Sequence, residues 1–434
     1  MGCFILYRLE SSNLSIQQQK IVDSYLNGDN IFISGGAGTG KSYLLNYLKR
    51  NFSHLGLEIT ASTGIASINI GGSTIHSFAG IGLANHPIEQ ILENLKHPKF
   101  SKLRKRIIRT RTLAIDEISM ISPELLEILD IVFQEIRQSK KVFGGLQVMF
   151  FGDFLQLPPV NKFNEEINYC FNSKIWKDLN LKNFILTQAF RQSENNFVEI
   201  LNNLRFGIVN ENDQKILESR VNVIDHNQAI KPTILTTHND RVERINAKFM
   251  QNISNKEFEF KAEFSGDLYK IDFLKKNCLA YQHLKLKVGA QVMMIKNTYS
   301  KEGVINGSLG IIRDFSVKKN YPVVEFVGNK ILTISPEDWN LEKFDHDTKS
   351  IKIEASISQI PLILAWAITI HKSQGLTLDK ISCDLSNVFS PGQCYVALSR
   401  VKSLNGLFIE SINFNKIIAD KNAVNFYKKI KSEC

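Results

Sequence analysis

The sequence has few cysteines, and their arrangement suits neither metal binding nor a disulfide framework. Its six cysteines are Cys3, Cys170, Cys278, Cys383, Cys394 and Cys434. None of them forms a C-x-x-C pair, and none has a histidine at zinc-ligand spacing, which argues against disulfides and zinc fingers. We therefore expect a protein of a reducing compartment.

Long apolar runs are also missing. No stretch approaches the roughly 20 apolar residues that span a bilayer, and segment 1–10 lacks the hydrophobic core and cleavage site of a signal peptide. These absences predict no membrane partner and an intracellular location. The location would be the cytoplasm or nucleoid of a prokaryote, or the nucleus or mitochondrion of a eukaryote.

The composition that remains is that of a globular protein with a basic surface. A chain of 434 residues suggests roughly two to four domains. The net charge of +10 favours a polyanionic partner, because clustered lysines and arginines neutralise phosphates. A basic soluble protein without such a partner would carry the same charge.

Short apolar runs alternate with helical patterns in the first half of the sequence. Strands are expected at 31–34, 58–62, 112–115 and 147–151, and helices at 42–52 and 123–137. Ser122 and Pro123 suit the cap and first turn of the second of these helices. Strands that alternate with helices indicate an α/β fold with a parallel sheet.

The same pattern restarts near residue 183 and is then interrupted. Strands are expected at 183–186 and 231–237, and helices at 195–206 and 240–249. Segment 285–359 instead has β-rich runs separated by turn residues, which predicts a small β-barrel or sandwich. A strand at 362–370 and a helix beginning near Ser373 return to the α/β pattern, so the β module is predicted to be an insertion.

A phosphate-binding motif follows the first expected strand. GGAGTGKS (35–42) matches G-x-x-x-x-G-K-[ST] between a strand and a helix, a context that argues against a chance glycine turn. Backbone N–H groups and the helix dipole would hold phosphate oxygens. Lys41 would reach the β- and γ-phosphates, and Ser42 would bind magnesium.

Two adjacent acids at the end of a later apolar strand complete this site. LAIDE (113–117) delivers Asp116 to hold magnesium and Glu117 to orient and deprotonate water. Such a pair alone is a weak signal, but it stands about 75 residues beyond a full phosphate-binding motif. Together the two motifs predict a nucleoside triphosphatase that uses ATP and Mg²⁺.

Further polar residues stand in short motifs along the chain. Gln18 could read adenine, and Gln156 in GDFLQLPPV (152–160) could contact the γ-phosphate. Arg191 and Arg400 could each reach across a cleft to the γ-phosphate and stabilise transition-state charge. Taken alone, Gln18, Arg191 and Arg400 are each more typical of an ordinary surface side chain.

Taken in order, the motifs resemble those of the superfamily-one DNA helicases, and most closely the Pif-one family. The similarity runs from about residue 14 to 427, and its most specific parts are 61–66, 71–82 and 116–137. RecD-type helicases share the phosphate-binding motif and HKSQG (371–375) but generally lack the last of these stretches.

The resemblance implies two RecA-like P-loop domains with a small β-barrel inserted in the second. The first domain would cover 1–182, with a small wedge-like insertion near 80–110. The second would cover 183–280 and 360–434, and the barrel 281–359. The resemblance also implies 5′-to-3′ translocation on single-stranded DNA and unwinding of duplex, forked and G-quadruplex DNA. The expected setting is genome maintenance, including DNA repair, recombination and telomere maintenance.

Family positions can be transferred onto this sequence residue by residue. Nucleotide contacts are implied for Gln18, Gly36, Gly38, Thr39, Gly40, Lys41, Ser42 and Gln374. DNA contacts are implied for Thr63, His76, Phe78, His238, Asn239, His371 and Lys372, where a packing or capping role is equally open. Segment 96–111 holds eight lysines or arginines and no acid, which suits a grip on DNA or a solvated helix face.

Single-stranded and forked DNA are the expected partners, together with a single-strand-binding protein, and a monomer is the default state. One alternative is a RecD-like helicase. Another is a DNA-stimulated ATPase that remodels protein–DNA complexes without unwinding. A third is a catalytically inactive homologue. All of the expected catalytic residues are present, namely Lys41, Glu117, Gln156, Arg191 and Arg400.

Overall fold

The computed structural model describes residues 14–82, 84–158, 167–192, 194–223, 229–345, 348, 350–386 and 390–433. The N-terminal segment 1–10 considered above lies outside these ranges. Among the described residues, no helix combines the length and the apolar character that crossing a bilayer requires.

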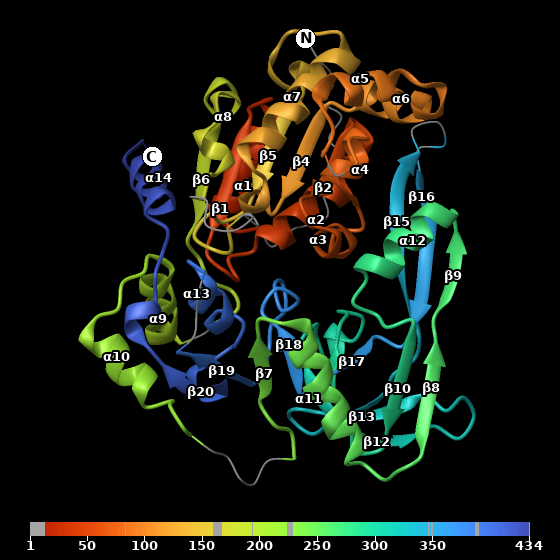
Figure 1. The fold of residues 1–434 in the computed structure, drawn as a ribbon, viewed down its shortest axis with the longest axis vertical. Helices are drawn as coiled ribbons and strands as arrows, with labels where there is room; N and C mark the ends of the chain where they lie inside the picture. Colours follow the sequence, from red (N-terminus) through yellow and green to blue (C-terminus); the bar gives the residue numbers. More distant parts are fainter. Residues whose placement is uncertain are drawn as a thin grey trace.

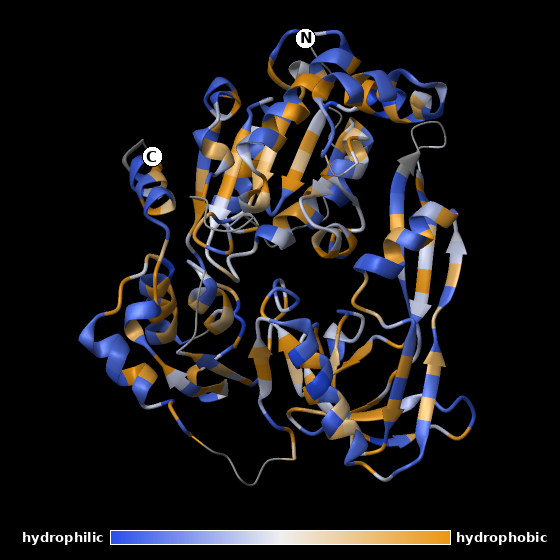
Figure 2. Ribbon diagram, viewed as in Figure 1, coloured by the Kyte–Doolittle hydropathy of each residue, from blue (hydrophilic) through white to orange (hydrophobic). Residues whose placement is uncertain are grey.

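A parallel sheet of six strands forms the centre of the first half of the chain (Figure 1). Its spatial order is β3-β2-β4-β5-β1-β6. The strands are β1 (Ile31–Gly35), β2 (Leu57–Ala61), β3 (Ser73–Thr74), β4 (Thr112–Asp116), β5 (Gln147–Phe151) and β6 (Lys182–Leu186). β1 and β4 are buried along their whole length, as expected for strands covered on both faces. Figure 2 shows hydrophobic residues concentrated in these central strands.

Eight helices in the described part of this half accompany the sheet. They are α1 (Ile16–Leu26), α2 (Lys41–Phe52), α3 (Gly64–Asn69), α4 (Ile75–Ala79), α5 (Ile88–Lys96), α6 (Ser101–Arg109), α7 (Pro123–Arg137) and α8 (Lys174–Asp178). Ser122 caps α7 by accepting a hydrogen bond from the N–H of Leu125, and Pro123 occupies its first turn, as predicted. The expected strands and helices of this half are therefore confirmed within a few residues.

A second parallel sheet of four strands lies below the first in Figure 1 and has the order β18-β7-β19-β20. Its strands are β7 (Thr233–Thr236), β18 (Ala367–Thr369), β19 (Ile381–Leu385) and β20 (Leu407–Ile412). The helices of this half are α9 (Asn195–Arg205), α10 (Glu211–Glu218), α11 (Asn239–Gln251), α13 (Gln393–Leu398) and α14 (Lys421–Glu433). β7 and β18 are neighbours in the sheet although more than a hundred residues separate them, so the chain between them is an insertion.

The inserted segment does not form the predicted closed barrel. Its described strands make three open sheets, with the orders β10-β8, β14-β13-β12-β11-β17 and β15-β16-β9. The strands are β8 (Glu257–Lys261), β9 (Glu263–Gly266), β10 (His283–Lys287), β11 (Gln291–Met294), β12 (Leu309–Phe315), β13 (Pro322–Phe326), β14 (Lys330–Thr333), β15 (Glu337–Asp345), β16 (Ser350–Gln359) and β17 (Leu362–Leu364). Barrel closure requires pairing between the outer strands, and the long β15–β16 hairpin pairs with β9 instead.

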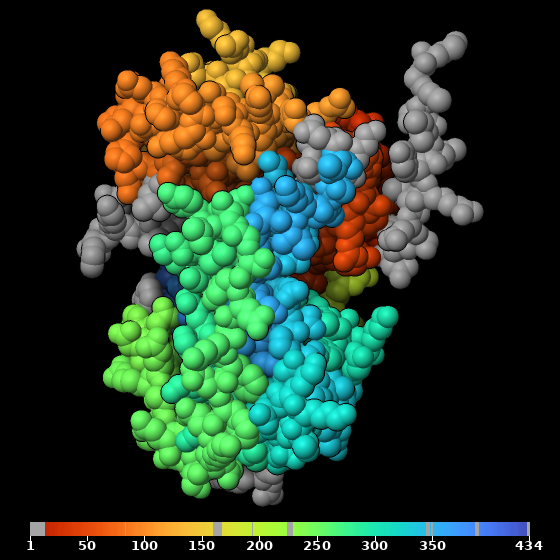
Figure 3. Space-filling model, turned by 90° about the vertical axis from the view of Figure 1, so that its right-hand side faces the viewer, coloured from red at the N-terminus to blue at the C-terminus, as the bar shows by residue number. Residues whose placement is uncertain are grey.

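The β15–β16 hairpin and α12 (Leu268–Asn277) extend from the insertion toward the first sheet (Figures 1 and 3). Lys49 at the end of α2 forms an ion pair with Glu342 of the hairpin at 3.1 Å. The same ammonium group donates hydrogen bonds to the carbonyls of Ile70 and Gly71. The insertion therefore contacts the first half of the chain directly.

Three sequence predictions require correction. β6 was expected to open the second RecA-like domain, but it pairs in parallel with β1 along five residues and so belongs to the first sheet. We call the part of the chain built on the six-stranded sheet the first unit, and the part built on the four-stranded sheet the second unit. α14 was assigned to the second unit, but Ala423, Tyr427 and Ile430 pack in the hydrophobic core of the first. The helix expected from Ser373 is a single turn, because Gly375 has a φ of 77° that ends it.

Phe133 provides a test of the core beneath α7. Its ring is fully buried and packs against Phe78 and Phe143. We expect Phe133→Ala to lower the free energy of unfolding by about 3–5 kcal/mol, because the deletion leaves a cavity. Thermal denaturation followed by circular dichroism measures this change. Ile131→Ala on the same helix, where the side chain is 41% exposed, should change stability by less than about 0.5 kcal/mol.

Candidate nucleotide-binding site

The phosphate-binding loop joins β1 to α2, as predicted. Gly38 and Gly40 have φ angles of 78° and 87°, a backbone conformation that side chains with a Cβ rarely adopt. A Cβ on Gly38 would also lie 2.6 Å from the Cβ of Arg191. The ammonium group of Lys41 donates hydrogen bonds to the carbonyls of Gly35 at 2.6 Å and Gly36 at 3.0 Å.

A cavity of about 300 Å³ opens over this loop, between the two halves of the chain. Its lining includes nine of the predicted residues: Gly38, Thr39, Gly40, Lys41, Ser42, Glu117, Gln156, Arg191 and Arg400. The first seven of these come from the first unit, and the two arginines come from beyond β6. Hydrogen-bond donors for phosphate, one carboxyl group and two guanidinium groups therefore surround the same cavity.

The acid pair lies at the C-terminal end of β4. Glu117 lines the cavity, whereas the predicted metal ligand Asp116 is buried and is not among the lining residues. Burial and the neighbouring Glu117 raise the pKa of Asp116 to about 7. Burial also raises the pKa of Glu117, partly offset by Lys41 and Arg400. Glu117 has a φ of 54°, a conformation that costs energy for a residue with a Cβ. Glu117 and Ser42 line the same cavity, and carboxylate and hydroxyl oxygens are ligands that suit Mg²⁺.

The two arginines are held by backbone carbonyls of the second unit. Arg191 donates to the carbonyl of Ser399 and, through Nε, to the hydroxyl of Thr377, both at 2.9 Å. Arg400 donates to the carbonyl of Val396 at 2.8 Å. Burial and the nearby Arg400 lower the pKa of Arg191 to about 9. Two guanidinium groups close together in a buried cleft favour the binding of an anion.

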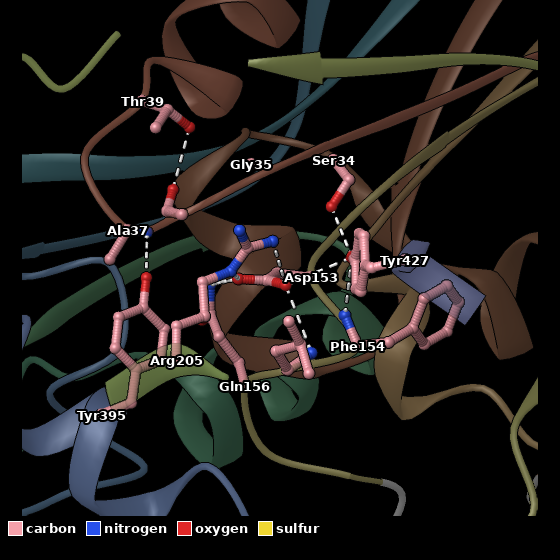
Figure 4. Close-up of polar contacts among 12 residues, drawn as sticks. Ser34, Gly35, Ala37, Thr39, Asp153, Phe154, Gln156, Arg205, Tyr395 and Tyr427 are labelled. Carbon is pink, nitrogen blue, oxygen red and sulfur yellow. Dashed lines mark hydrogen bonds and ion pairs between the residues drawn. The ribbon is translucent and has the colours of Figure 1, made fainter. Parts of the chain in front are cut away.

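Gln156 reaches the cavity from the loop that follows β5. Its side-chain amide donates to a carboxylate oxygen of Asp153 at 3.3 Å (Figure 4). Asp153 in turn forms a buried ion pair with Arg205 of α9 at 2.8 Å. The position of Gln156 therefore depends on a carboxylate that also contacts the second unit.

The remaining predicted nucleotide contacts lie at the edge of the cavity or away from it. Gln18 is buried, completes a capping box with Ser15, and donates to the carbonyl of Gly40 at 3.3 Å. Gly36 and Gln374 are not among the residues that line the cavity, whereas Gly375 is.

Five lining residues were not predicted as site residues, namely Ala37, Tyr43, Phe190, Gly375 and Thr377. Phe190 is 57% exposed, and its ring lies beside Gly40. The sequence signal that could have identified it is an aromatic residue directly before Arg191.

The predicted DNA-binding residues occupy both units. Thr63 caps α3 by accepting a hydrogen bond from the N–H of Ala66. His76 lines a groove of about 820 Å³ together with Phe100 and Phe273. Phe78 is only 1% exposed and packs against Phe133. Its implied contact with DNA stays a prediction.

The second-unit members of the set lie at the starts of turns and helices. His238 is the N-cap of α11 and is exposed, as is the adjacent Asn239. His371 is exposed and Lys372 is half-buried, both in the turn after β18. Desolvation lowers the pKa of His76 and of His371, so each ring prefers the neutral form.

Comparison with known proteins decides the family. The model of the PIF1-like helicase family matches residues 13–215, and that of the 2B domain of DNA helicase Pif1 matches residues 271–315. The ATP-dependent DNA helicase Pif1 of Bdellovibrio bacteriovorus is 34% identical over 96% of this chain and 92% of its own length. The chain belongs to the PIF1-like helicase family.

The proteins similar to this chain differ in length, and their solved structures differ in the ligands they contain. The ATP-dependent DNA helicase PIF1 of Xenopus laevis is 36% identical over 97% of this chain, which spans 65% of that relative's length. The crystal structure of Bacteroides sp Pif1 in complex with ADP-AlF4 is 32% identical, covers 97% of this chain and 98% of its own, and has a TM-score of 0.85. The crystal structure of Bacteroides Pif1 bound to ssDNA is also 32% identical, covers 97% of this chain and 98% of its own, and has a TM-score of 0.63.

We expect Asp116→Asn to raise the melting temperature of the nucleotide-free chain, and to do so more at high pH. The folded chain holds the Asp116 proton up to about pH 7, whereas the unfolded carboxyl loses it near pH 4. Ionisation therefore destabilises the fold increasingly as the pH rises between these values. Asparagine carries no charge and can still accept the hydrogen bond from the N–H of Glu117.

Thermal melting of both proteins at about pH 5 and about pH 8 measures this effect. The advantage of the asparagine variant should be larger at the higher pH by roughly 2 °C or more. An equal difference at the two pH values would show that the buried carboxyl carries no such penalty.

Proposed function

We propose that this chain is an ATP-dependent DNA helicase that translocates 5′ to 3′ on single-stranded DNA and unwinds duplex and forked DNA. One observation carries the ATPase part of the proposal. Arg191 and Arg400 of the second unit line the same cavity as Lys41 and Glu117 of the first. A nucleotide that joined these groups would draw the two units together.

The chain's residues divide the chemistry of hydrolysis among them. Glu117 would orient the attacking water and accept its proton. Lys41, Arg191 and Arg400 would stabilise the charge that develops on the γ-phosphate. Ser42 and Asp116 would hold Mg²⁺, which when bound neutralises phosphate charge. Phe190, exposed beside Gly40, would offer a flat surface for the base of the nucleotide.

The DNA strand would cross both units. Supporting positions are Thr63 and His76 on the first unit, and His238, Asn239, His371 and Lys372 on the second. Alternating grip by the two units, driven by opening and closing of the cavity, would convert each hydrolysis into a step. The Bacteroides relative bound to ssDNA supports this class of partner. Activity on G-quadruplex DNA, monomeric action and contact with a single-strand-binding protein stay predictions.

We expect Lys41→Ala to abolish ATP hydrolysis and unwinding while single-stranded DNA binding stays within about threefold of wild type. The lysine is the only ammonium group among the residues lining the described cavity, and no neighbour replaces its charge on the phosphates. Phosphate release and fluorescence anisotropy with a labelled oligonucleotide measure the two activities. Lys20→Ala, on the exposed face of α1, serves as the control. A Lys41→Ala variant that still unwound DNA would contradict the assignment.

Duplexes that carry either a 5′ or a 3′ single-stranded tail test the direction of movement. With ATP and magnesium, we expect strand separation of the 5′-tailed duplex and none of the 3′-tailed duplex. Unwinding of only the 3′-tailed duplex would keep the helicase and overturn the polarity. DNA-stimulated hydrolysis with neither duplex unwound would instead favour an ATPase that remodels protein–DNA complexes.

A further inference from the structure

The hydroxyl group of Tyr427 lies at the junction of two loops that form the nucleotide site (Figure 4). It is fully buried, although α14 belongs to the far C-terminal end of the chain. It accepts hydrogen bonds from the hydroxyl of Ser34 and from the N–H of Phe154 at 3.2 Å. It donates to a carboxylate oxygen of Asp153 at 3.2 Å.

These three partners belong to different walls of the site. Ser34 stands in β1, directly before the first glycine of the phosphate-binding loop. Asp153 and Phe154 begin the loop that carries Gln156. A single hydroxyl group therefore sets the spacing between the strand that leads into the phosphate-binding loop and the loop that bears Gln156.

Asp153 connects Tyr427 to Gln156 through hydrogen bonds. Its carboxylate accepts hydrogen bonds from the Gln156 amide at 3.3 Å, from the Leu155 N–H at 3.2 Å, and from two nitrogens of Arg205 at 2.8 and 2.9 Å. Burial alone would raise the pKa of Asp153, but the Arg205 guanidinium holds it below its usual value. The carboxylate therefore stays charged and retains all of its donors.

Burial raises the pKa of the Tyr427 phenol, so the hydroxyl keeps its proton and remains a donor to Asp153. The Arg205 guanidinium lies 5.0 Å from the Tyr427 ring centre, which fixes the ring as well as the hydroxyl. The phenol thus has one orientation and one set of partners.

We propose that Tyr427 is a positioning residue for ATP hydrolysis, which holds Gln156 at its working distance from the phosphate-binding loop through Asp153. It is not among the described residues that line the cavity, so it would act through Gln156 and not as a catalytic residue. The inference rests on the proposed ATPase activity and adds to it a role for the C-terminal helix. A displacement of about 1 Å at a group that contacts the transition state can cost up to about a hundredfold in rate.

Tyr427→Phe removes only the hydroxyl group and so tests this role. In a steady-state ATPase assay with single-stranded DNA and magnesium, we expect kcat to fall by about tenfold or more. KM for ATP should stay within about twofold, because the residues that bind the nucleotide are untouched. Ser34→Ala, which removes one partner of the same hydroxyl and leaves the ring in place, should lower kcat in the same direction.

Tyr169→Phe is the matched control. Tyr169 is fully buried in the same aromatic cluster, with its ring centre 5.6 Å from that of Phe154. Its hydroxyl has no hydrogen-bond partner in the described part of the chain. Loss of this hydroxyl should leave kcat within about twofold of wild type. An equal loss of kcat in both phenylalanine variants would reduce the effect to general packing and overturn the proposal.

A double-mutant cycle with Gln156→Ala separates positioning from general destabilisation. If Tyr427 acts through Gln156, then adding Tyr427→Phe to Gln156→Ala should lower kcat by less than about twofold more. A full, multiplicative loss in that background would contradict the proposal, as would an unchanged kcat in the single variant. A wild-type chain without ATPase activity would instead contradict the proposed function itself. Should Tyr427→Phe fail to fold, Ser34→Ala carries the same cycle.

Discussion

A buried ion pair between Asp153 and Arg205 joins the two α/β units beside the nucleotide site. The carboxylate is completely buried and the guanidinium is 6% exposed, so neither charge is stabilised by water. Removal of one partner from such a pair typically costs about 3–5 kcal/mol, because the other is left uncompensated. The pair therefore requires the loop after β5 and helix α9 to remain together, whatever happens at the rest of the cleft.

Around this contact, the cleft holds pairs of like charges that opposite charges offset only in part, as Lys41 and Arg400 do for Glu117. Asp116 and Glu117 repel each other on one wall, and Arg191 and Arg400 repel each other on the other. Burial increases the cost of both arrangements. A triphosphate with a divalent cation would present charges complementary to those of both walls. Such complementary charges would favour closure of the two units around a nucleotide, as the proposed mechanism requires.

The C-terminal helix α14 also contacts the region beside the nucleotide site. Tyr427 contacts Ser34 across 393 residues of sequence and places its ring against Arg205. The β15–β16 hairpin provides a second long-range contact through Lys49 and Glu342 at the far end of α2. Helix α2 begins at the phosphate-binding loop, so both contacts involve elements that adjoin this loop.

The sequence by itself determined those features whose physics is local. Glycines at fixed spacing between a strand and a helix predicted the loop at 35–42, and an apolar strand ending in two acids predicted Asp116 and Glu117. Only the tertiary structure decided which contacts distant segments make. β6 belongs to the first sheet because its backbone pairs with β1. The inserted strands form open sheets because the β15–β16 hairpin pairs with β9. Phe78 became core because α7 covers it, and Tyr427 reached the site because α14 folds back. Pairing and packing of this kind depend on which surfaces meet in space, and no spacing along the chain records that.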